Sequence, residues 1–377
     1  MIRFNEAPYI GTEFSHIQKA IESGQLSGGG EYTNLCQEWL KEKCGDTAGV
    51  LLTTSCTHAM EMAAMLADVR EGDEIIMPSF TFVSTATAFV QRGASIVFID
   101  IRPDTLNMDE SLIENAITER TKAIVPVHYA GVGCEMDSIM EIASAYKLTV
   151  IEDAAQGVMA TYKGKMLGAI GDFGCYSYHD TKNFTMGEGG AIVIKNKDLY
   201  EKAEILREKG TNRSMFFRGM VDKYTWVDKG SSYIPSELNA AYLYPQLHAA
   251  ESIICDRMAS WELYKSLLSP LAEQGFIELP FIPEDRCHNA HMFYIKTKNL
   301  EERALLITFL TGRDIIAVFH YVPLHSSPAG KKYGRLHGTD DYTTRESERI
   351  LRLPLFYGLT ADSVRHVADS IVGFYSK

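Results

Sequence analysis

The sequence predicts an α/β fold, a mainly parallel sheet with helices on both faces, followed by a smaller α+β domain. Short β-branched runs alternate with helical stretches through the first two thirds of the chain. This alternation stops near residue 246, where a long amphipathic stretch leads into mixed elements. The chain has 377 residues and is 46% hydrophobic, enough for two cores. We therefore expect domains at residues 1–245 and 246–377.

The expected elements follow in βα order. Bounded apolar runs rich in Val and Ile indicate strands, and the periodic stretches between them indicate helices. Strands are expected at 49–54, 73–79, 95–100, 122–128 and 148–154, and helices at 58–69, 109–117 and 135–147. The C-terminal part should contain a helix at 246–268, mixed elements that include HMFYIKT (291–297), and a final helix at 360–375.

Composition excludes several classes of protein. The net charge of -12 argues against binding to nucleic acid or an anionic membrane, which requires clustered Lys and Arg. No apolar run is long enough to span a membrane, and the N-terminus lacks a secretory signal, so we expect a cytoplasmic protein. Seven scattered cysteines without a CxxC pair indicate free thiols, and no metal site is expected.

In an open α/β sheet, ligands bind beyond the carboxyl ends of the strands. The first strand is followed by Ser55, Cys56 and Thr57 at the start of a helix. Free N–H groups and hydroxyls at this point suit a phosphate, although Ser55 taken alone favours a simple helix cap.

Two further strand ends carry candidate ligand contacts. The second gives Phe80 and Phe82 at the pocket mouth, where an aromatic ring stacks on a flat ligand or packs under a loop. The fifth gives Glu152 and Asp153. Because side chains alternate along a strand, only one of these carboxylates should face the crevice, either toward a ligand or as a helix cap.

The stretch YSYHDTKNFTMGEGGAIV places Lys182 at a tight turn between two expected strands. A lysine on such a turn is usually solvated. Together, however, a phosphate site, an aromatic ring, a strand-end carboxylate and a lysine match the needs of pyridoxal 5'-phosphate (PLP).

The run SYHDTKNFTMGEGGAIV, with EDAAQG and PSFTFVST, resembles the DegT/DnrJ/EryC1/StrS sugar aminotransferase family. The similarity extends to FHYVPLHSSPAG and RLPLFYGL, and so covers essentially the whole chain. It implies a PLP-dependent transferase of fold type I, like aspartate aminotransferase, with a seven-stranded sheet. It also implies a homodimer with the cofactor near the subunit interface.

The resemblance implies a role for each matching residue. Lys182 would form the Schiff base, and Asp153 would hold the pyridine nitrogen protonated. Ser232 stands where many relatives have an Asn that reaches the phosphate from the other subunit. The remaining implied cofactor contacts are Ser55, Cys56, Thr57, Phe82, Gln156 and Ser177.

The resemblance also implies the reaction, in which L-glutamate supplies the amino group. Segments such as REKGTNRSMFFRG favour C4 of dTDP-4-keto-6-deoxy-D-glucose as the acceptor, with a galacto product. A gluco product, C3 amination and an inactive regulator of the same fold remain alternatives. The polar segment 209–232 is expected to be a loop that is functional or lies at an interface, and 23–33 is expected to be a flexible entrance loop. Candidate substrate contacts are Arg213, Arg218, Lys223, Tyr321 and His325.

Overall fold

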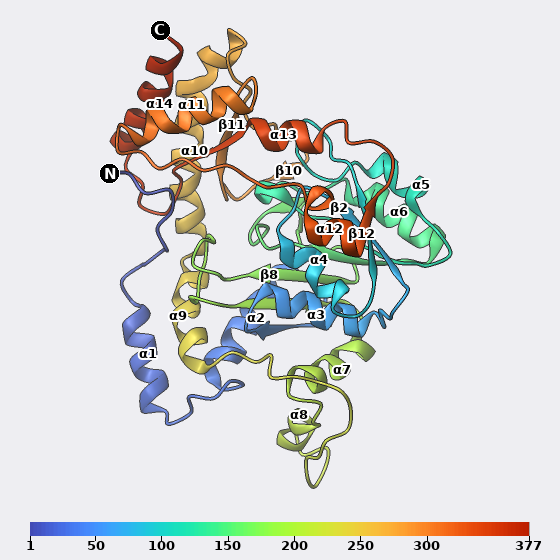
Figure 1. Cartoon of the computed structure of the whole chain (residues 1–377). Coiled ribbons are helices and arrows are strands. Elements are labelled where there is room, and N and C mark those ends of the chain that lie inside the picture. Colours follow the sequence, from blue (N-terminus) through green and yellow to red (C-terminus); the bar gives the residue numbers. More distant parts are fainter. Residues whose placement is uncertain (377) are drawn as a thin grey trace.

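The computed structural model describes residues 1–376, and its centre is an eight-stranded, mainly parallel sheet (Figure 1). The predicted α/β class is confirmed. Seven strands come from residues 49–194, and β9 runs antiparallel to both of its neighbours. A short eighth strand comes from the C-terminal part and pairs in parallel with β3. In sheet order the strands are β1 (Gly49–Thr53), β9 (Gly190–Ile194), β8 (Phe173–Ser177), β5 (Thr149–Asp153), β4 (Thr121–Ile124), β2 (Glu74–Pro78), β3 (Ser95–Ile99) and β12 (Gly334–Leu336).

Helices cover both faces of the sheet, as predicted. Side chains alternate along each strand, so Leu51 packs with one set of helices while Val50 and Leu52 pack with the other. On one face lie α3 (Cys56–Leu66), α4 (Val83–Val90) and α7 (Lys197–Arg207). On the other lie α2 (Glu31–Cys44), α5 (Ile113–Ala116), α6 (Met136–Tyr146) and α9 (Glu237–His248).

The C-terminal part has its own apolar core, built around Trp261, Tyr264 and Phe293. The helix expected at 246–268 begins later, because α9 continues to His248 and the next helix starts only at Ala250. The expected domain division at 246 therefore falls inside α9, and it stays a prediction. The main elements here are α10 (Ala250–Glu273), β11 (Phe293–Lys296), α11 (Leu300–Thr311), β13 (Ile350–Leu353) and α14 (Ala361–Tyr375).

Shorter elements connect these layers. The segment 209–232 contains α8, which projects from the body at the bottom of Figure 1. These shorter elements are α1 (Glu13–Glu22), α8 (Arg213–Phe217), α12 (Pro328–Tyr333), α13 (Thr343–Arg349), β6 (Thr161–Tyr162), β7 (Lys165–Met166) and β10 (Arg286–Cys287).

The connection that carries Lys182 is longer than the tight turn predicted from the sequence. It spans residues 178–189, between β8 and β9. Backbone bonds from Tyr178 to Gly189 (2.8 Å) and from Met186 to Tyr178 (3.0 Å) close it, and Phe184 is buried beneath it. The prediction was wrong because these apolar residues belong to the loop's own packing and do not extend the strands.

Glu237 connects the N-terminal segment to α9. Its buried carboxylate accepts hydrogen bonds from the backbone N–H groups of Gly30 (3.0 Å), Tyr32 (2.8 Å) and Thr33 (3.2 Å), and from the Thr33 hydroxyl. A Cβ at Gly30 would lie 2.7 Å from the Glu237 carboxyl carbon, so glycine is required there. The expected flexible entrance loop is therefore anchored by Glu237 at its C-terminal end.

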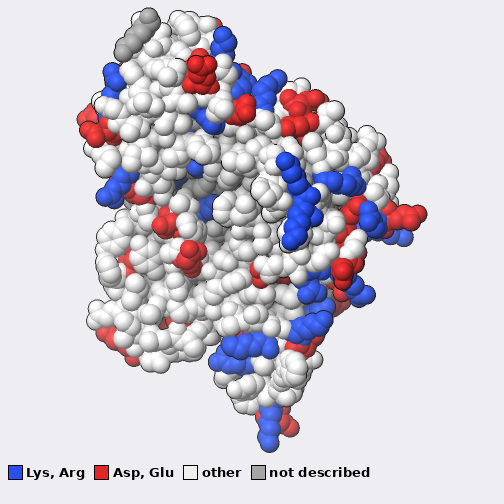
Figure 2. Space-filling view, viewed as in Figure 1, with Lys and Arg blue, Asp and Glu red and all other residues white. Residues whose placement is uncertain are grey.

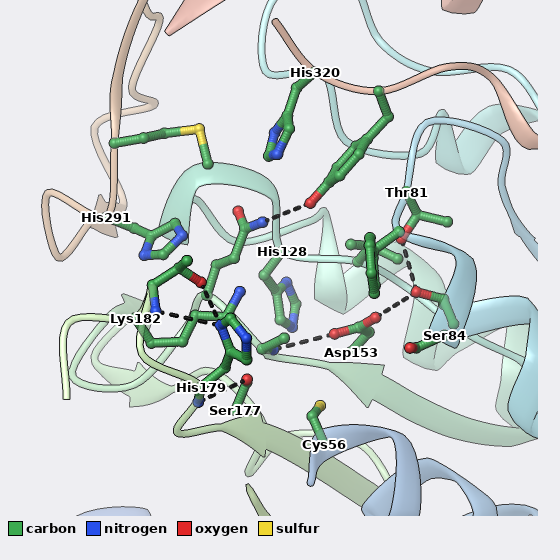
Figure 3. A pocket seen from close by; sticks show the side chains of 18 of the residues that line it. Cys56, Thr81, Ser84, His128, Asp153, Ser177, His179, Lys182, His291 and His320 are labelled. Atoms are coloured by element: carbon green, nitrogen blue, oxygen red, sulfur yellow. Dashed lines mark hydrogen bonds between the residues drawn. The ribbon is translucent and has the colours of Figure 1, made fainter. Parts of the chain in front are cut away.

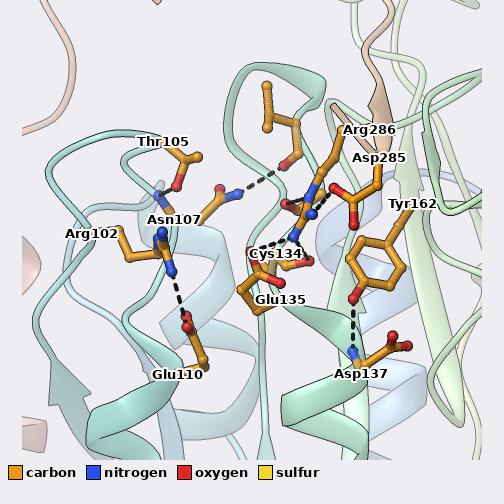
Figure 4. A network of polar contacts seen from close by, with 12 residues as sticks. Arg102, Thr105, Asn107, Glu110, Cys134, Glu135, Asp137, Tyr162, Asp285 and Arg286 are labelled. Carbon is orange, nitrogen blue, oxygen red and sulfur yellow. Dashed lines mark hydrogen bonds and ion pairs between the residues drawn. The ribbon is translucent and has the colours of Figure 1, made fainter. Parts of the chain in front are cut away.

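A polar network holds the segment that follows β4 (Figure 4). The Asn107 side chain donates to the carbonyl oxygen of Val132 (2.9 Å) and accepts from the N–H of Tyr129 (2.9 Å). The Arg286 guanidinium pairs with Glu135 at 2.6 Å. These contacts fix the turn at Tyr129 and Ala130, and the N–H of Ala130 donates to Gln156 in the site described below.

Acidic and basic side chains are interspersed over the face shown in Figure 2. Among residues 1–376, no helix combines the length and the apolar character needed to cross a membrane.

Replacing Glu237 by Gln should lower the free energy of unfolding by about 2–4 kcal/mol, because several buried N–H donors lose their charged acceptor. Urea denaturation of both proteins measures the difference. Glu251→Gln on α10 is the control, since the Glu251 side chain is 86% exposed. Equal losses in the two variants would contradict an anchoring role for Glu237.

Candidate functional site

A cavity of about 690 Å³ lies at the carboxyl ends of the parallel strands, where the strand-end analysis predicts a ligand site (Figure 3). The strand ends and the connection 178–189 supply most of its wall. The C-terminal part closes it with residues around His291, His320 and Arg352, and Phe4 and Asn5 of the N-terminal segment also line it.

The carboxylates at the end of β5 point to opposite sides, so only Asp153 faces the cavity, as expected. Glu152 is fully buried and accepts hydrogen bonds from the N–H groups of Gly168 (2.8 Å), Ile170 (2.7 Å) and Gly171 (2.7 Å). His128 Nε2 lies 2.8 Å from it. Because the N–H of Cys134 donates to His128 Nδ1 (3.2 Å), Nε2 carries the proton donated to Glu152.

Asp153 is held by two hydrogen bonds of its own. The Thr85 hydroxyl donates to Oδ2 (2.6 Å), and the N–H of Ala155 donates to Oδ1 (3.1 Å). Thr81 Oγ1 lies 2.8 Å from Thr85 Oγ1, so that two buried hydroxyls stand in line behind the carboxylate. Sequence reasoning missed Thr81 and Thr85, although both lie in the PSFTFVST segment.

The start of α3 forms the floor of the cavity. The hydroxyl of Ser55 accepts from the N–H of His58 (3.0 Å), so its side chain caps the helix. A helix cap at Ser55 is therefore compatible with an anion site at the same helix start. Cys56 and Thr57 occupy the first turn, where N–H groups lack intrahelical acceptors. A Cβ at Gly190 would lie 2.5 Å from the backbone nitrogen of Cys56, so glycine lets β9 pass close behind this turn. Ser177, at the end of β8, lines the same region.

Lys182 is half-buried and lines the cavity together with Asp153. Burial lowers the pKa of its ammonium group, and the positive charge of Arg352 acts in the same direction. The negative charge of Asp153 opposes this shift. The environment therefore favours a neutral amine at a lower pH than for a lysine in water.

Aromatic and amide side chains form the wall above these groups. Phe82 lines the cavity and is 56% exposed, whereas Phe80 is buried against Tyr129 and Tyr321. The expectation that Phe80 lies at the pocket mouth is therefore wrong, because its side chain fills the core. Gln156 accepts from the N–H of Ala130 (2.6 Å) and donates to the Tyr321 hydroxyl (3.2 Å), so its amide is fixed in the cavity wall.

Several predicted site residues lie outside this cavity. His325 bonds to Ser79 (2.7 Å) and contacts Asp340 (3.2 Å), away from the opening. Arg213 pairs with Glu208 (3.0 Å), and Arg218 binds Glu204 through two hydrogen bonds (2.9 and 2.7 Å). Ser232 and Lys223 are exposed in the same segment.

The C-terminal part contributes three basic side chains that the sequence analysis did not single out: His291, His320 and Arg352. Burial lowers the pKa of both histidines, and nearby Arg352 adds to the effect, so both imidazoles are neutral near pH 7. RLPLFYGL, quoted above for its resemblance, contains Arg352. No local pattern indicated that the Arg352 side chain faces the same cavity as Lys182, which lies far away in the sequence.

Residues 9–372 match the model of the DegT/DnrJ/EryC1/StrS aminotransferase family. The chain is 31% identical to the spore coat polysaccharide biosynthesis protein SpsC of Bacillus subtilis, covering 97% of this chain and 95% of SpsC. It superposes on DesV of S. venezuelae, solved in complex with a ketimine intermediate, with a TM-score of 0.90 and 28% identity, covering 100% of this chain and 99% of DesV. It also superposes on the PLP form of the putative sugar aminotransferase Spr1654 of Streptococcus pneumoniae, with a TM-score of 0.88 and 26% identity. This superposition covers 98% of this chain and 97% of Spr1654.

Thr85→Val should lower the free energy of unfolding by about 1.5–3 kcal/mol, because it removes a hydrogen bond to a charged acceptor and leaves the Thr81 hydroxyl without its neighbour. Chemical denaturation measures the loss. Thr87→Val, at an exposed position of the same helix, provides the matched control. If both variants have wild-type stability, the hydroxyl pair does not support Asp153.

Proposed function

Since this chain belongs to the DegT/DnrJ/EryC1/StrS aminotransferase family, we propose that it is a PLP-dependent nucleotide-sugar aminotransferase. L-Glutamate gives its amino group to C4 of dTDP-4-keto-6-deoxy-D-glucose. The products are 2-oxoglutarate and dTDP-4-amino-4,6-dideoxy-D-galactose. The observation that carries the proposal is that Lys182 and Asp153 line one cavity with the start of α3.

The residues of the cavity fit PLP. The N–H groups of Cys56 and Thr57, with the Ser55 segment and the Ser177 hydroxyl, would hold its phosphate, since a helix start favours an anion. Phe82 would lie against the ring, Gln156 near its 3'-oxygen, and Asp153 at the pyridine nitrogen. When bound, PLP supplies an electron sink for the carbanion that transamination requires.

Lys182 would attach the cofactor, and its amine would carry the proton in both halves of the reaction. Its amine must be neutral to take a proton from the donor carbon, and burial provides the lowered pKa. The Asp153 carboxylate accepts hydrogen bonds from the Thr85 hydroxyl and the N–H of Ala155, which orient it, and its charge would stabilise a proton on the pyridine nitrogen. The same lysine returns the proton in the second half of the reaction, when the amino group passes to the sugar.

We propose a homodimer, in which the projecting segment 209–232 contributes to a second copy's cavity. Apolar side chains on this segment are exposed, among them Phe217 (69%) and Trp226 (78%), which supports burial against another chain. Ser232 would then approach the phosphate, and Arg213, Arg218 and Lys223 the sugar diphosphate. Tyr321 would contact the sugar from within the chain, and His325 would support that wall through Ser79.

Absorbance spectroscopy tests the proposal. The purified protein with PLP should show a visible band that L-glutamate bleaches and that dTDP-4-keto-6-deoxy-D-glucose restores, because the amino group passes through the cofactor. NMR of the product then assigns C4 or C3 amination and the gluco or galacto configuration. If L-glutamate bleaches the band and the sugar does not restore it, the proposed sugar substrate is wrong. A protein that never gives the band would instead support the inactive regulator.

Lys182→Ala should lose turnover by at least about four orders of magnitude while the protein stays folded, since the side chain lines a cavity. Borohydride reduction followed by peptide mass spectrometry should find PLP on Lys182 of the wild type and not in the variant. Lys197→Ala, on the exposed start of α7, is the control. Normal turnover in Lys182→Ala would contradict the proposed catalytic role of Lys182.

A further inference from the structure

The ring of His291 is held at one edge by Asn183, the residue that follows Lys182. Nδ1 of His291 lies 3.0 Å from Oδ1 of Asn183. The Asn183 amide has one orientation, because its Nδ2 donates to the carbonyl oxygen of Asn289 (2.8 Å) and the reverse would set two oxygens against each other. Oδ1 is therefore the acceptor, and Nδ1 of His291 carries the proton. Because burial lowers the pKa of the imidazole, the ring is neutral near pH 7 and Nε2 carries a lone pair.

The backbone around His291 is fixed as closely as its ring. The Arg257 guanidinium donates to the carbonyl oxygens of Ala290 (3.1 Å) and His291 (2.8 Å). Nδ2 of Asn289 donates to the carbonyl oxygen of Gln156 (2.8 Å), in the opposite wall of the site. Ala290 has a φ of 47°, in the left-handed region that a residue with a Cβ rarely adopts. A strained backbone that is held from several sides is typical of a functional position.

Nε2 of His291 is left for a ligand. The ring lines the cavity, and Figure 3 shows it beside Lys182. Since Nδ1 is turned to the buried Asn183, the edge that carries Nε2 faces the cavity. Within residues 1–376, no group donates a hydrogen bond to Nε2. By contrast, the side-chain oxygen of Gln156 already accepts from a backbone N–H (2.6 Å). A ligand with a hydrogen-bond donor therefore finds a free acceptor at His291.

The position beside Lys182 narrows the class of donor. L-Glutamate brings carboxylates, which are acceptors at neutral pH, and its amino group is the group that is transferred. In the keto sugar, the reacting C4 has two ring neighbours. C3 bears a hydroxyl, and C5 bears the C6 methyl group. The hydroxyl donor nearest the reacting carbon is therefore the one on C3.

We propose that Nε2 of His291 accepts a hydrogen bond from the C3 hydroxyl of the keto sugar, and so selects sugars with a free hydroxyl next to the ketone. This inference deepens the proposed function and rests on it. A neutral acceptor suits a neutral hydroxyl, because neither partner carries a charge that must be desolvated. His291 thereby determines specificity, while proton transfer stays with Lys182.

The test compares dTDP-4-keto-6-deoxy-D-glucose with its 3-deoxy analogue, on protein that L-glutamate has first bleached. The rate at which each sugar restores the band is measured. Wild type should prefer the hydroxylated sugar about 10-fold, the contribution of one neutral hydrogen bond. His291→Asn keeps a donor for Asn183 at the place of Nδ1 and removes the acceptor at Nε2. It should react about 10-fold more slowly with the hydroxylated sugar and at the wild-type rate with the analogue, so that the preference is lost.

Calorimetry gives a readout that does not depend on turnover. dTDP-6-deoxy-D-glucose has the C3 hydroxyl and no ketone, so it binds without reacting. Its Kd should rise about 10-fold in His291→Asn, whereas the Kd of dTDP should not change. His291→Gln brings an amide oxygen near the place of Nε2 and should restore part of the preference. His366→Asn, at an exposed position of α14, is the matched control.

An equal loss with both sugars in His291→Asn overturns the inference, because the effect then does not pass through the C3 hydroxyl. A preference that matches wild type also overturns it. Slower bleaching of this variant by L-glutamate, with normal recovery by the sugar, overturns it as well and assigns His291 to the amino donor. A wild type that L-glutamate does not bleach, or whose band the sugar does not restore, refutes the proposed function itself, which separates the two failures.

Discussion

The buried carboxylate of Glu152 is the interaction on which the site depends. Three N–H groups from residues 168–171 and the ring of His128 converge on it. A buried charge with this many donors has one favourable position, so the end of β5 is fixed relative to the segments on either side. The side chain of the next residue, Asp153, points into the cavity, and its backbone is fixed together with that of Glu152. Backbone bonds to Pro126 (2.9 Å) and from His128 (3.1 Å) hold it on the neighbouring strand as well.

A single carboxylate could not both use all its oxygens in internal hydrogen bonds and remain available to the cavity, and here two adjacent residues divide these roles. Glu152 saturates its oxygens with donors and stabilises the fold, while Asp153 keeps part of its surface toward the cavity. Alternation along one strand assigns the two roles. Thr85, on α4, then orients the carboxylate of Asp153 that faces the cavity. The position of the cavity-facing carboxylate thus depends on hydrogen bonds from neighbouring residues.

The sequence predicted what depends on short-range order. Val- and Ile-rich runs located the strands. Because ligands bind beyond the carboxyl ends of parallel strands, the sequence also predicted that Ser55, Asp153 and Lys182 lie near one edge of the sheet. It did not predict Arg352, Thr85 or the burial of Phe80, because these depend on which loops meet in space. The 178–189 connection was misjudged for a related reason, since Phe184 looks like a strand residue but packs beneath its own loop. The sequence also did not predict that Arg213 and Arg218 pair with Glu208 and Glu204, away from the cavity.

The eighth strand has a consequence for biosynthesis. β3 is the edge of the sheet built by the first half of the chain, and its partner β12 is more than 230 residues later, anchored by N–H groups of residues 341–343 that bind Asp100. During translation, this edge stays open until the ribosome has released most of the polypeptide. An open apolar edge templates intermolecular pairing, so the nascent chain requires protection for that interval. Chains truncated before residue 334 would keep the edge permanently and should accumulate as aggregates.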